Sequence, residues 1–132
     1  MITGREFTIG VFKAKGKIIA LPITEIISQK EFFDFEAKYE GASKEVTPAE
    51  IDPVWKEQIE NTAKRVYEVF NCMGVVRIDF IYNTVENKAY MLEINTVPGQ
   101  SEASIVPQQV RAMGWSLEDF YSALVEEALT NR

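Results

Sequence analysis

Two short runs in the second half of the chain carry residue types that could do chemistry. Residues 77–79 read Arg-Ile-Asp, and residues 93–95 read Glu-Ile-Asn. If the runs are strands of an antiparallel hairpin that turns near Glu86, Asp79 faces Glu93 and Arg77 faces Asn95. Side chains alternate between the two faces of a strand, so these four polar side chains are expected to project from one side of the hairpin.

The other face of this hairpin supports the same register. A slip of one residue would exchange both faces, so matched apolar pairs indicate the correct alignment. The register predicts three such pairs: Ile78 with Ile94, Phe80 with Leu92, and Tyr82 with Tyr90.

Two carboxylates placed directly across a sheet repel each other, and a bound cation would reverse that cost. The oxygens of Asp79, Glu93 and Asn95 suit Mg²⁺ or Mn²⁺, and Mg²⁺ is often held by one or two carboxylates together with substrate phosphates. Arg77 could then bind a phosphate or a developing negative charge. The alternative is that Arg77 forms an ordinary surface salt bridge with Asp79 or Glu93, and the hairpin alone leaves this open.

The run that follows the second strand adds a possible anion site. Gly99 can offer a backbone N–H without a side chain in the way. Ser101 and Ser104 lie near the expected start of a helix, where N–H groups and the helix dipole favour a carboxylate or phosphate. A simple turn followed by a helix cap would also account for the two serines.

Composition narrows the chemistry further. The chain of 132 residues has no histidine and one cysteine, Cys72, so a metal site must use oxygen ligands and no internal disulfide can form. Its net charge of −6, without a basic stripe, argues against binding nucleic acid or an anionic membrane. We find no apolar run long enough to cross a membrane and no secretory signal, so a cytoplasmic location is expected.

The elements that must position these residues form an α+β pattern. We expect helices from about Asp52 to Phe70, where Asp52 caps and Pro53 opens the helix, from Ser104 to Met113, and onward from Ser116. The segment from Gln29 to Val46 fits neither period and is expected to be an ordered surface loop. Strands are expected in four places: residues 6–12, 18–23, 75–82 and 89–96.

Together these motifs resemble the D-alanine–D-alanine ligases of the ATP-grasp superfamily. The run Glu93-Ile94-Asn95-Thr96-Val97-Pro98-Gly99, with Arg77-Ile78-Asp79-Phe80 upstream, is similar to their C-terminal signature. Further similar runs occur in the family's order along essentially the whole chain: Gly4-Arg5-Glu6-Phe7-Thr8, Leu21-Pro22, Phe33-Asp34-Phe35-Glu36-Ala37-Lys38-Tyr39 and Gly114-Trp115-Ser116.

The resemblance implies a fold and a reaction. Residues 1–132 would form a C-terminal ATP-grasp catalytic domain, a mainly antiparallel sheet with helices packed on one face. ATP would phosphorylate the carboxylate of one D-alanine, and the amine of a second D-alanine would attack the acyl phosphate. The family enzyme is more than twice as long, so this chain would lack the N-terminal domain and most of the central ATP-binding domain, and it is expected to be inactive alone. The full-length enzyme is expected to be a homodimer.

The resemblance also implies roles for individual residues. Asp79, Glu93 and Asn95 would hold two Mg²⁺ or Mn²⁺ ions on the ATP phosphates, with Glu93 bridging both ions. Arg77 and the Gly99 N–H would stabilise the oxyanion. The remaining implied contacts are those of Ser104 and Ile105 with the carboxylate of the second substrate, Glu6 with the ATP ribose, Phe32 with the nucleotide, Lys38 with the γ-phosphate, and Tyr39 in closing the loop over the site.

The chain departs from the family pattern after the Pro-Gly, where Gln100-Ser101 replaces a common Met-Thr. This could alter the surroundings of the second substrate. Three other readings stay open: a related ATP-grasp ligase such as one making D-alanyl-D-lactate, a non-catalytic metal- or nucleotide-binding module, and an interaction domain. The Lys38-Tyr39 pair favours the dipeptide enzyme, and no large apolar surface stripe supports an interaction domain.

Overall fold

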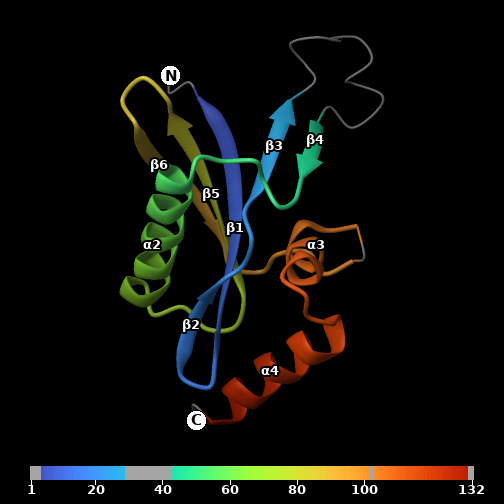
Figure 1. The fold of residues 1–132 in the computed structure, drawn as a ribbon. Coiled ribbons are helices and arrows are strands. Elements are labelled where there is room, and N and C mark those ends of the chain that lie inside the picture. The colour runs from blue at the N-terminus through green and yellow to red at the C-terminus, as the bar shows by residue number, and fades with distance from the viewer. Residues whose placement is uncertain (1–3, 29–42, 102, 131–132) are drawn as a thin grey trace.

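The computed structural model describes residues 4–28, 43–101 and 103–130, and Figure 1 shows their arrangement. Strands and helices follow one another as β1 (Arg5–Ala14), β2 (Lys17–Ala20), β3 (Thr24–Ser28), β4 (Ser43–Val46), α2 (Pro53–Val69), β5 (Val76–Asn83), β6 (Lys88–Asn95), α3 (Ile105–Ala112) and α4 (Leu117–Thr130). None of the helices in these residues is long and apolar enough to cross a membrane.

One antiparallel sheet organises the chain, with β1 at its centre. The strand order is β4-β3-β1-β5-β6, and β2 pairs with β1 beside β3. Along one edge, β1 pairs with β5 from Arg5 to Val11. Along its other edge β1 pairs first with β3 and then with β2, so the ladder is interrupted near Gly10.

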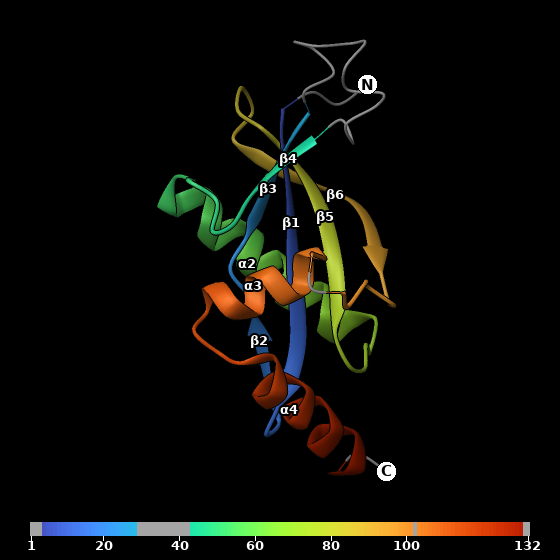
Figure 2. The same ribbon diagram turned by 90° about the vertical axis from the view of Figure 1, so that its right-hand side faces the viewer.

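Helices cover both faces of this sheet, which corrects the prediction that they pack on one face. Figure 2 shows α3 and α4 in front of β1 and α2 behind it. Phe7, Ile9 and Val11 join the core under α2, whereas Phe12 and Ala14 join a second core with α3 and α4. The physical reason is that β1 is buried on both faces from Phe7 to Phe12, as in strands that are covered on both sides.

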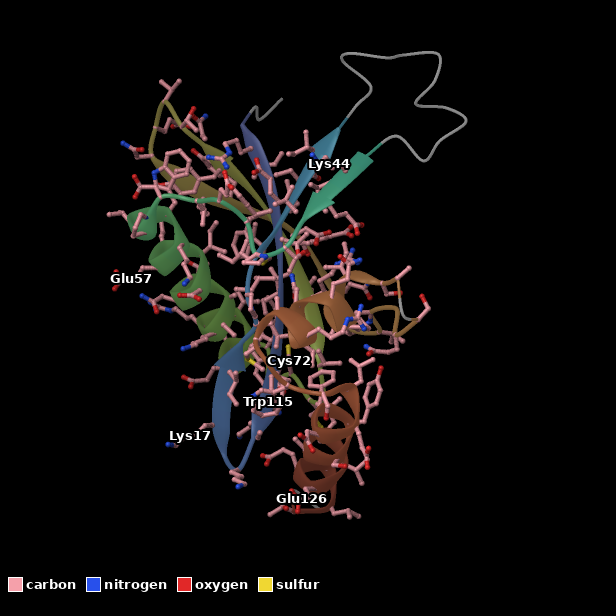
Figure 3. The ribbon with its side chains drawn as sticks, turned by 45° about the vertical axis from the view of Figure 1, so that its right-hand side comes forward. Lys17, Lys44, Glu57, Cys72, Trp115 and Glu126 are labelled. Atoms are coloured by element: carbon pink, nitrogen blue, oxygen red, sulfur yellow. The ribbon has the colours of Figure 1, made fainter. Side chains whose placement is uncertain are left out.

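The second core is built around aromatic rings. Phe12 makes edge-to-face contacts with Phe120, at 5.0 Å between ring centroids, and with Trp115, at 5.7 Å. Trp115, labelled in Figure 3, lies in the turn between α3 and α4. These contacts hold the two C-terminal helices against the C-terminal half of β1.

The helix ends are formed as the sequence predicted. At the start of α2, Asp52 accepts a hydrogen bond from the Val54 N–H at 2.8 Å, and Pro53 occupies the first turn. Ser116 accepts one from the Asp119 N–H at 3.0 Å before α4. Gly114 has a φ of +94°, a conformation that glycine adopts without strain.

The hairpin of β5 and β6 confirms three of the five predicted pairs. Arg77 pairs with Asn95, Ile78 with Ile94 and Asp79 with Glu93. The next two predicted pairs are wrong, because a bulge between Asp79 and Phe80 places Phe80 opposite Met91 and Tyr82 opposite Ala89. The bulge inserts Leu92 as an extra residue beside the carboxylates, a place where bulges often re-aim side chains.

The segment predicted as one long loop is partly a strand. Ser43–Val46 forms β4 and pairs with β3, which the sequence did not predict either. The predicted second strand ends at Ala20 instead of Ile23. Residues 29–42 lie outside the described part of the chain.

Candidate functional site

The predicted polar face of the hairpin exists and lies beside α3. Val76, Ile78, Phe80 and Tyr82 are buried toward α2, while the residues between them are only half-buried on the other face. Asp79 and Glu93 are direct neighbours there, and Arg77 and Asn95 form the next pair. Because α3 and α4 pack on β1, this face of β5 and β6 stays open to solvent at Glu93.

Asp79 is held by two donors. The Thr8 hydroxyl donates to its Oδ1 at 2.6 Å, and the Arg77 Nε lies 3.3 Å from the same oxygen. The ion pair that the sequence left open is therefore present, between Arg77 and Asp79. Within the described residues Glu93 has no such ion pair, so its charge remains uncompensated directly opposite Asp79.

Asn95 ends the strand and starts the turn. Its Oδ1 accepts a hydrogen bond from the Val97 N–H at 3.0 Å. Such a turn, made by an Asn side chain bonding the backbone two residues on, fixes the amide at the end of β6. Because Asn95 is two residues from Glu93 on β6 and pairs with Arg77, its side chain belongs to the same face as the two carboxylates.

The residues of the predicted anion site lie close together. The hydroxyls of Ser101 and Ser104 share a hydrogen bond at 2.7 Å, and the Ser104 N–H donates to the Ser101 carbonyl at 2.8 Å. A Cβ on Gly99 would lie 2.9 Å from the Ser104 Oγ, so a side chain at Gly99 would push against this serine. Ile105 opens α3, and the Ser104 side chain makes no cap hydrogen bond.

Glu6 lies on the same face of β1 as Thr8, two residues away. Partial burial of its carboxyl group, and then the charge of Asp79, raise the pKa of Glu6. The carboxylates of Glu6 on β1 and Asp79 on β5 are therefore close enough to interact electrostatically. Phe32, Lys38 and Tyr39, the other predicted nucleotide and loop residues, lie outside the described residues.

Gln100, where the chain departs from the family pattern, packs against α4. Its Oε1 accepts a hydrogen bond from the Tyr121 hydroxyl at 3.2 Å, and its Nε2 donates to the Pro98 carbonyl at 3.2 Å. The side chain is thereby bonded back to the turn and the last helix.

The donor set fits a hard cation. Asp79, Glu93 and Asn95 offer only oxygen atoms, as Mg²⁺ and Mn²⁺ prefer. In the described ranges, no three His, Cys, Asp or Glu residues form a cluster that could hold a metal. At this site the protein would therefore supply only the two carboxylates and the amide. Substrate phosphates and water would have to complete the shell of a Mg²⁺ ion.

Sequence reasoning missed two residues that support this site. Thr8 bonds Asp79, and the fully buried Gln109 bonds the backbone of Thr8 and Gly10. Thr8 could have been found as a lone hydroxyl in an apolar strand. Gln109 could have been found as a polar residue on the apolar stripe of its helix.

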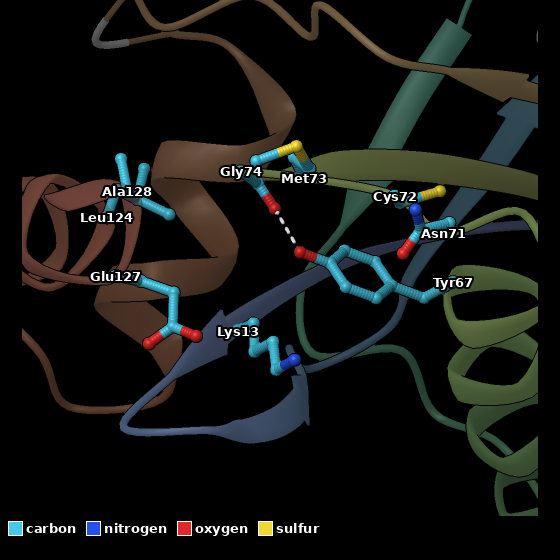
Figure 4. Close-up of a pocket in the computed structure, with 9 residues that line it drawn as sticks. All are labelled: Lys13, Tyr67, Asn71, Cys72, Met73, Gly74, Leu124, Glu127 and Ala128. Atoms are coloured by element: carbon cyan, nitrogen blue, oxygen red, sulfur yellow. Dashed lines mark hydrogen bonds between the residues drawn. The ribbon is translucent and has the colours of Figure 1, made fainter. Parts of the chain in front are cut away.

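A pocket of about 330 Å³ lies elsewhere, between the C-terminal end of α2 and α4 (Figure 4). At its centre the Tyr67 hydroxyl donates to the Gly74 carbonyl at 2.7 Å. None of the residues that line it lies on the hairpin face that carries Asp79 and Glu93. Its lining residues are Lys13, Tyr67, Asn71, Cys72, Met73, Gly74, Leu124, Glu127 and Ala128.

Curated relatives match this chain along almost its whole length. The D-alanine–D-alanine ligase of Flavobacterium johnsoniae is 48% identical over 128 residues, which is 97% of this chain and 39% of the relative. The enzyme of the same name from Parabacteroides distasonis is 40% identical over 131 residues, or 99% of this chain and 39% of the relative. The chain thus spans about 39% of the length of these relatives.

Solved structures share the fold. D-alanyl-alanine synthetase A from Vibrio cholerae has a TM-score of 0.84 at 27% identity, over 99% of this chain and 40% of that chain. D-alanine–D-alanine ligase from Bacillus anthracis has a TM-score of 0.81 at 30% identity, over 98% and 41%. VanG D-Ala:D-Ser ligase from Enterococcus faecalis has a TM-score of 0.80 at 28% identity, over 96% and 36%.

The family signature spans nearly the whole chain. A family model described as "D-ala D-ala ligase C-terminus" matches residues 1–126. The α+β fold and the antiparallel hairpin with its carboxylates agree with that match, and the chain therefore belongs to the D-alanine–D-alanine ligase C-terminal family.

Proposed function

We propose that this chain is the C-terminal catalytic part of an ATP- and Mg²⁺-dependent ligase that joins two D-alanines through an acyl phosphate, for peptidoglycan synthesis. Family membership supports this, and so does a similar Bacillus anthracis ligase solved in complex with ATP. The observation that carries the proposal is the placement of Glu93 opposite Asp79, an arrangement of like charges that a cation would stabilise.

In this proposal Asp79, Glu93 and Asn95 hold two Mg²⁺ or Mn²⁺ ions against the ATP phosphates. Bound there, the ions would neutralise charge on the phosphates. Arg77 and the Gly99 N–H would stabilise the negative charge that develops on the reacting carboxylate, a contribution worth about 3–4 kcal/mol for one well-placed donor. The ion pair of Arg77 with Asp79 supports this role, because it holds the guanidinium next to a proposed metal ligand.

Ser104 and Ile105 would receive the carboxylate of the second D-alanine at the start of α3, where backbone N–H groups favour an anion. Glu6 would contact the ribose of ATP. The remaining roles rest on the family resemblance alone: Phe32 beside the nucleotide, Lys38 at the γ-phosphate and Tyr39 over the closed site.

The proposal includes the setting of the enzyme. We propose a cytoplasmic location, because the reaction consumes ATP, and a homodimeric full-length enzyme. No role for nucleic acid or a membrane surface follows from a chain with a net charge of −6. Light scattering of the complete enzyme would test the dimer.

The test is a chimeric ligase in which residues 1–132 replace the matching segment of the Flavobacterium johnsoniae enzyme. We expect phosphate release that depends on D-alanine, ATP and Mg²⁺, with D-alanyl-D-alanine identified by mass spectrometry. The Asp79→Asn variant should lose this activity, whereas Glu86→Gln, a change at the turn of the same hairpin, should keep it.

Other outcomes point to other functions. A folded chimera that binds ATP and Mg²⁺ without ligation would indicate a non-catalytic binding module. A preference for D-serine or D-lactate as the second substrate would indicate a related ligase. An Asp79→Asn chimera as active as its parent would contradict the assignment of the metal site.

A further inference from the structure

Thr8 lies beside Asp79, on the neighbouring strand of the sheet. It is 1% exposed, in the middle of the central strand β1, with Asp79 as its partner on β5. Its hydroxyl donates to Asp79 Oδ1 at 2.6 Å, a short distance typical of a hydrogen bond to a charged oxygen. Because Thr8 is buried, water does not compete with Asp79 for its hydroxyl group.

The backbone of Thr8 is fixed on its other side by α3. Gln109 is fully buried, and its Nε2 donates to the Thr8 carbonyl at 3.0 Å. The Gln109 Oε1 accepts a hydrogen bond from the Gly10 N–H at 2.8 Å. A Cβ on Gly10 would lie 2.9 Å from this oxygen, so glycine is needed for the close approach. Gln109 thus bonds to β1 in the gap near Gly10, where the neighbouring strand changes from β3 to β2.

These contacts leave one side of the Asp79 carboxylate available. Thr8 and Arg77 both donate to Oδ1. Within the described ranges, no group donates a hydrogen bond to Oδ2. An ionised carboxylate has about four lone-pair sites, so it can accept these donors on one oxygen while the other binds a ligand.

We propose that Thr8 is a positioning residue for Asp79 as a cation ligand: its buried hydroxyl fixes one oxygen of the carboxylate, and the second oxygen would bind Mg²⁺ or Mn²⁺. This rests on the proposed function, and it deepens the description of the same site. Hydrogen bonds behind a metal ligand orient the ligand, and losing one typically weakens metal binding about 10- to 100-fold.

The test measures Mn²⁺ binding to the chimeric ligase without nucleotide, by electron paramagnetic resonance of the free ion. Thr8→Val keeps the side-chain shape and removes the hydroxyl, and we expect the Kd for Mn²⁺ to rise about 10- to 100-fold. Thr8→Ser, which retains the hydroxyl, should bind Mn²⁺ close to the parent level. The Mg²⁺ concentration for half-maximal ligation should rise in parallel in Thr8→Val only.

Thr24→Val is the matched control. Thr24 is 0% exposed and sits opposite Thr8 on β3, but its hydroxyl bonds Gln109 and Thr47 rather than Asp79. It should lower the thermal midpoint while leaving the Kd for Mn²⁺ within about twofold of the parent. If Thr8→Val does not fold, the pair Thr8→Ser and Thr8→Ala, which differ only in the hydroxyl, replaces it.

Each result has a defined meaning. Unchanged Mn²⁺ binding by Thr8→Val, in a parent that does bind Mn²⁺, overturns the positioning role and leaves the ligase proposal intact. Equal losses in Thr8→Val and Thr24→Val overturn it as well, because they indicate a general structural effect. A folded parent that neither binds Mn²⁺ nor ligates D-alanine overturns the proposed function and this inference together.

Discussion

Replacing Gln109 with methionine should destabilise the fold more than any polar change on the surface of α3. Gln109 is 0% exposed and makes three hydrogen bonds to β1 and β3, at 2.8 Å to the Gly10 N–H, 3.0 Å to the Thr8 carbonyl and 3.0 Å to the Thr24 hydroxyl. Methionine is unbranched and similar in length, so it fills the same space without polar atoms.

The magnitude follows from which groups lose their partners. The Gly10 N–H is buried, and an unsatisfied buried donor costs about 1–3 kcal/mol. Thr24 keeps a partner, because its hydroxyl is also bonded to Thr47 at 2.6 Å. Adding roughly 1 kcal/mol for the two remaining bonds gives a loss of about 2–4 kcal/mol in the free energy of unfolding. For a domain of this size the thermal midpoint should fall by roughly 10 °C.

The assay is thermal and urea unfolding of the 132-residue chain, followed by circular dichroism. Gln108→Met is the matched control, since Gln108 is the preceding residue of the same helix and its bonds to Ala103 and Glu45 are exposed. This control should change the free energy of unfolding by less than about 1 kcal/mol. A loss for Gln109→Met no larger than that of the control would refute the reasoning from buried hydrogen bonds.

In the chimeric ligase, Glu93→Gln should lower turnover about 100- to 1000-fold, while the thermal midpoint stays equal or rises, because Glu93 faces Asp79 and has no ion pair among the described residues; an active but destabilised variant would support a purely structural salt bridge. Burial raises the pKa of Tyr67 to about 12, so the stability from its protonated hydroxyl is present below pH ~10 and is lost as the pH rises toward that value. Tyr67→Phe removes the hydrogen bond to the Gly74 carbonyl and should cost about 1 kcal/mol of unfolding free energy at pH 8. The thermal midpoint of this variant should fall less steeply at alkaline pH than that of the parent, and an equally steep fall would contradict the assignment. The 132-residue chain alone should release no phosphate in response to D-alanine, because it spans about 39% of its relatives, and a malachite green assay of the purified chain checks this.

The chain's sequence determined the local features of this protein. Strand alternation and the pairing of Ile78 with Ile94 predicted that Asp79 faces Glu93, which the structure confirms. The caps of α2 and α4, at Asp52 and Ser116, were also predictable. These features depend on residues close in sequence or on one hairpin, where the period of two and the capping rules are strong constraints.

Only the tertiary structure decided which distant elements meet. The bulge beyond Asp79 breaks the predicted pairs of Phe80 and Tyr82, because the local twist of β6 has no signature in the residue pattern. Helices cover both faces of the sheet since the apolar residues of β1 serve two cores, which periodicity alone does not assign to particular helices.

The support beneath the site depends on the same long-range packing. Thr8 and Asp79 are 71 residues apart in sequence, and Gln109 lies 101 residues from Thr8. The sequence could name the carboxylates, because their chemistry and spacing are local. It could mark Thr8 and Gln109 as polar residues among apolar ones, but it could not assign their partners, because a buried polar residue shows its role only through the groups that folding brings to it.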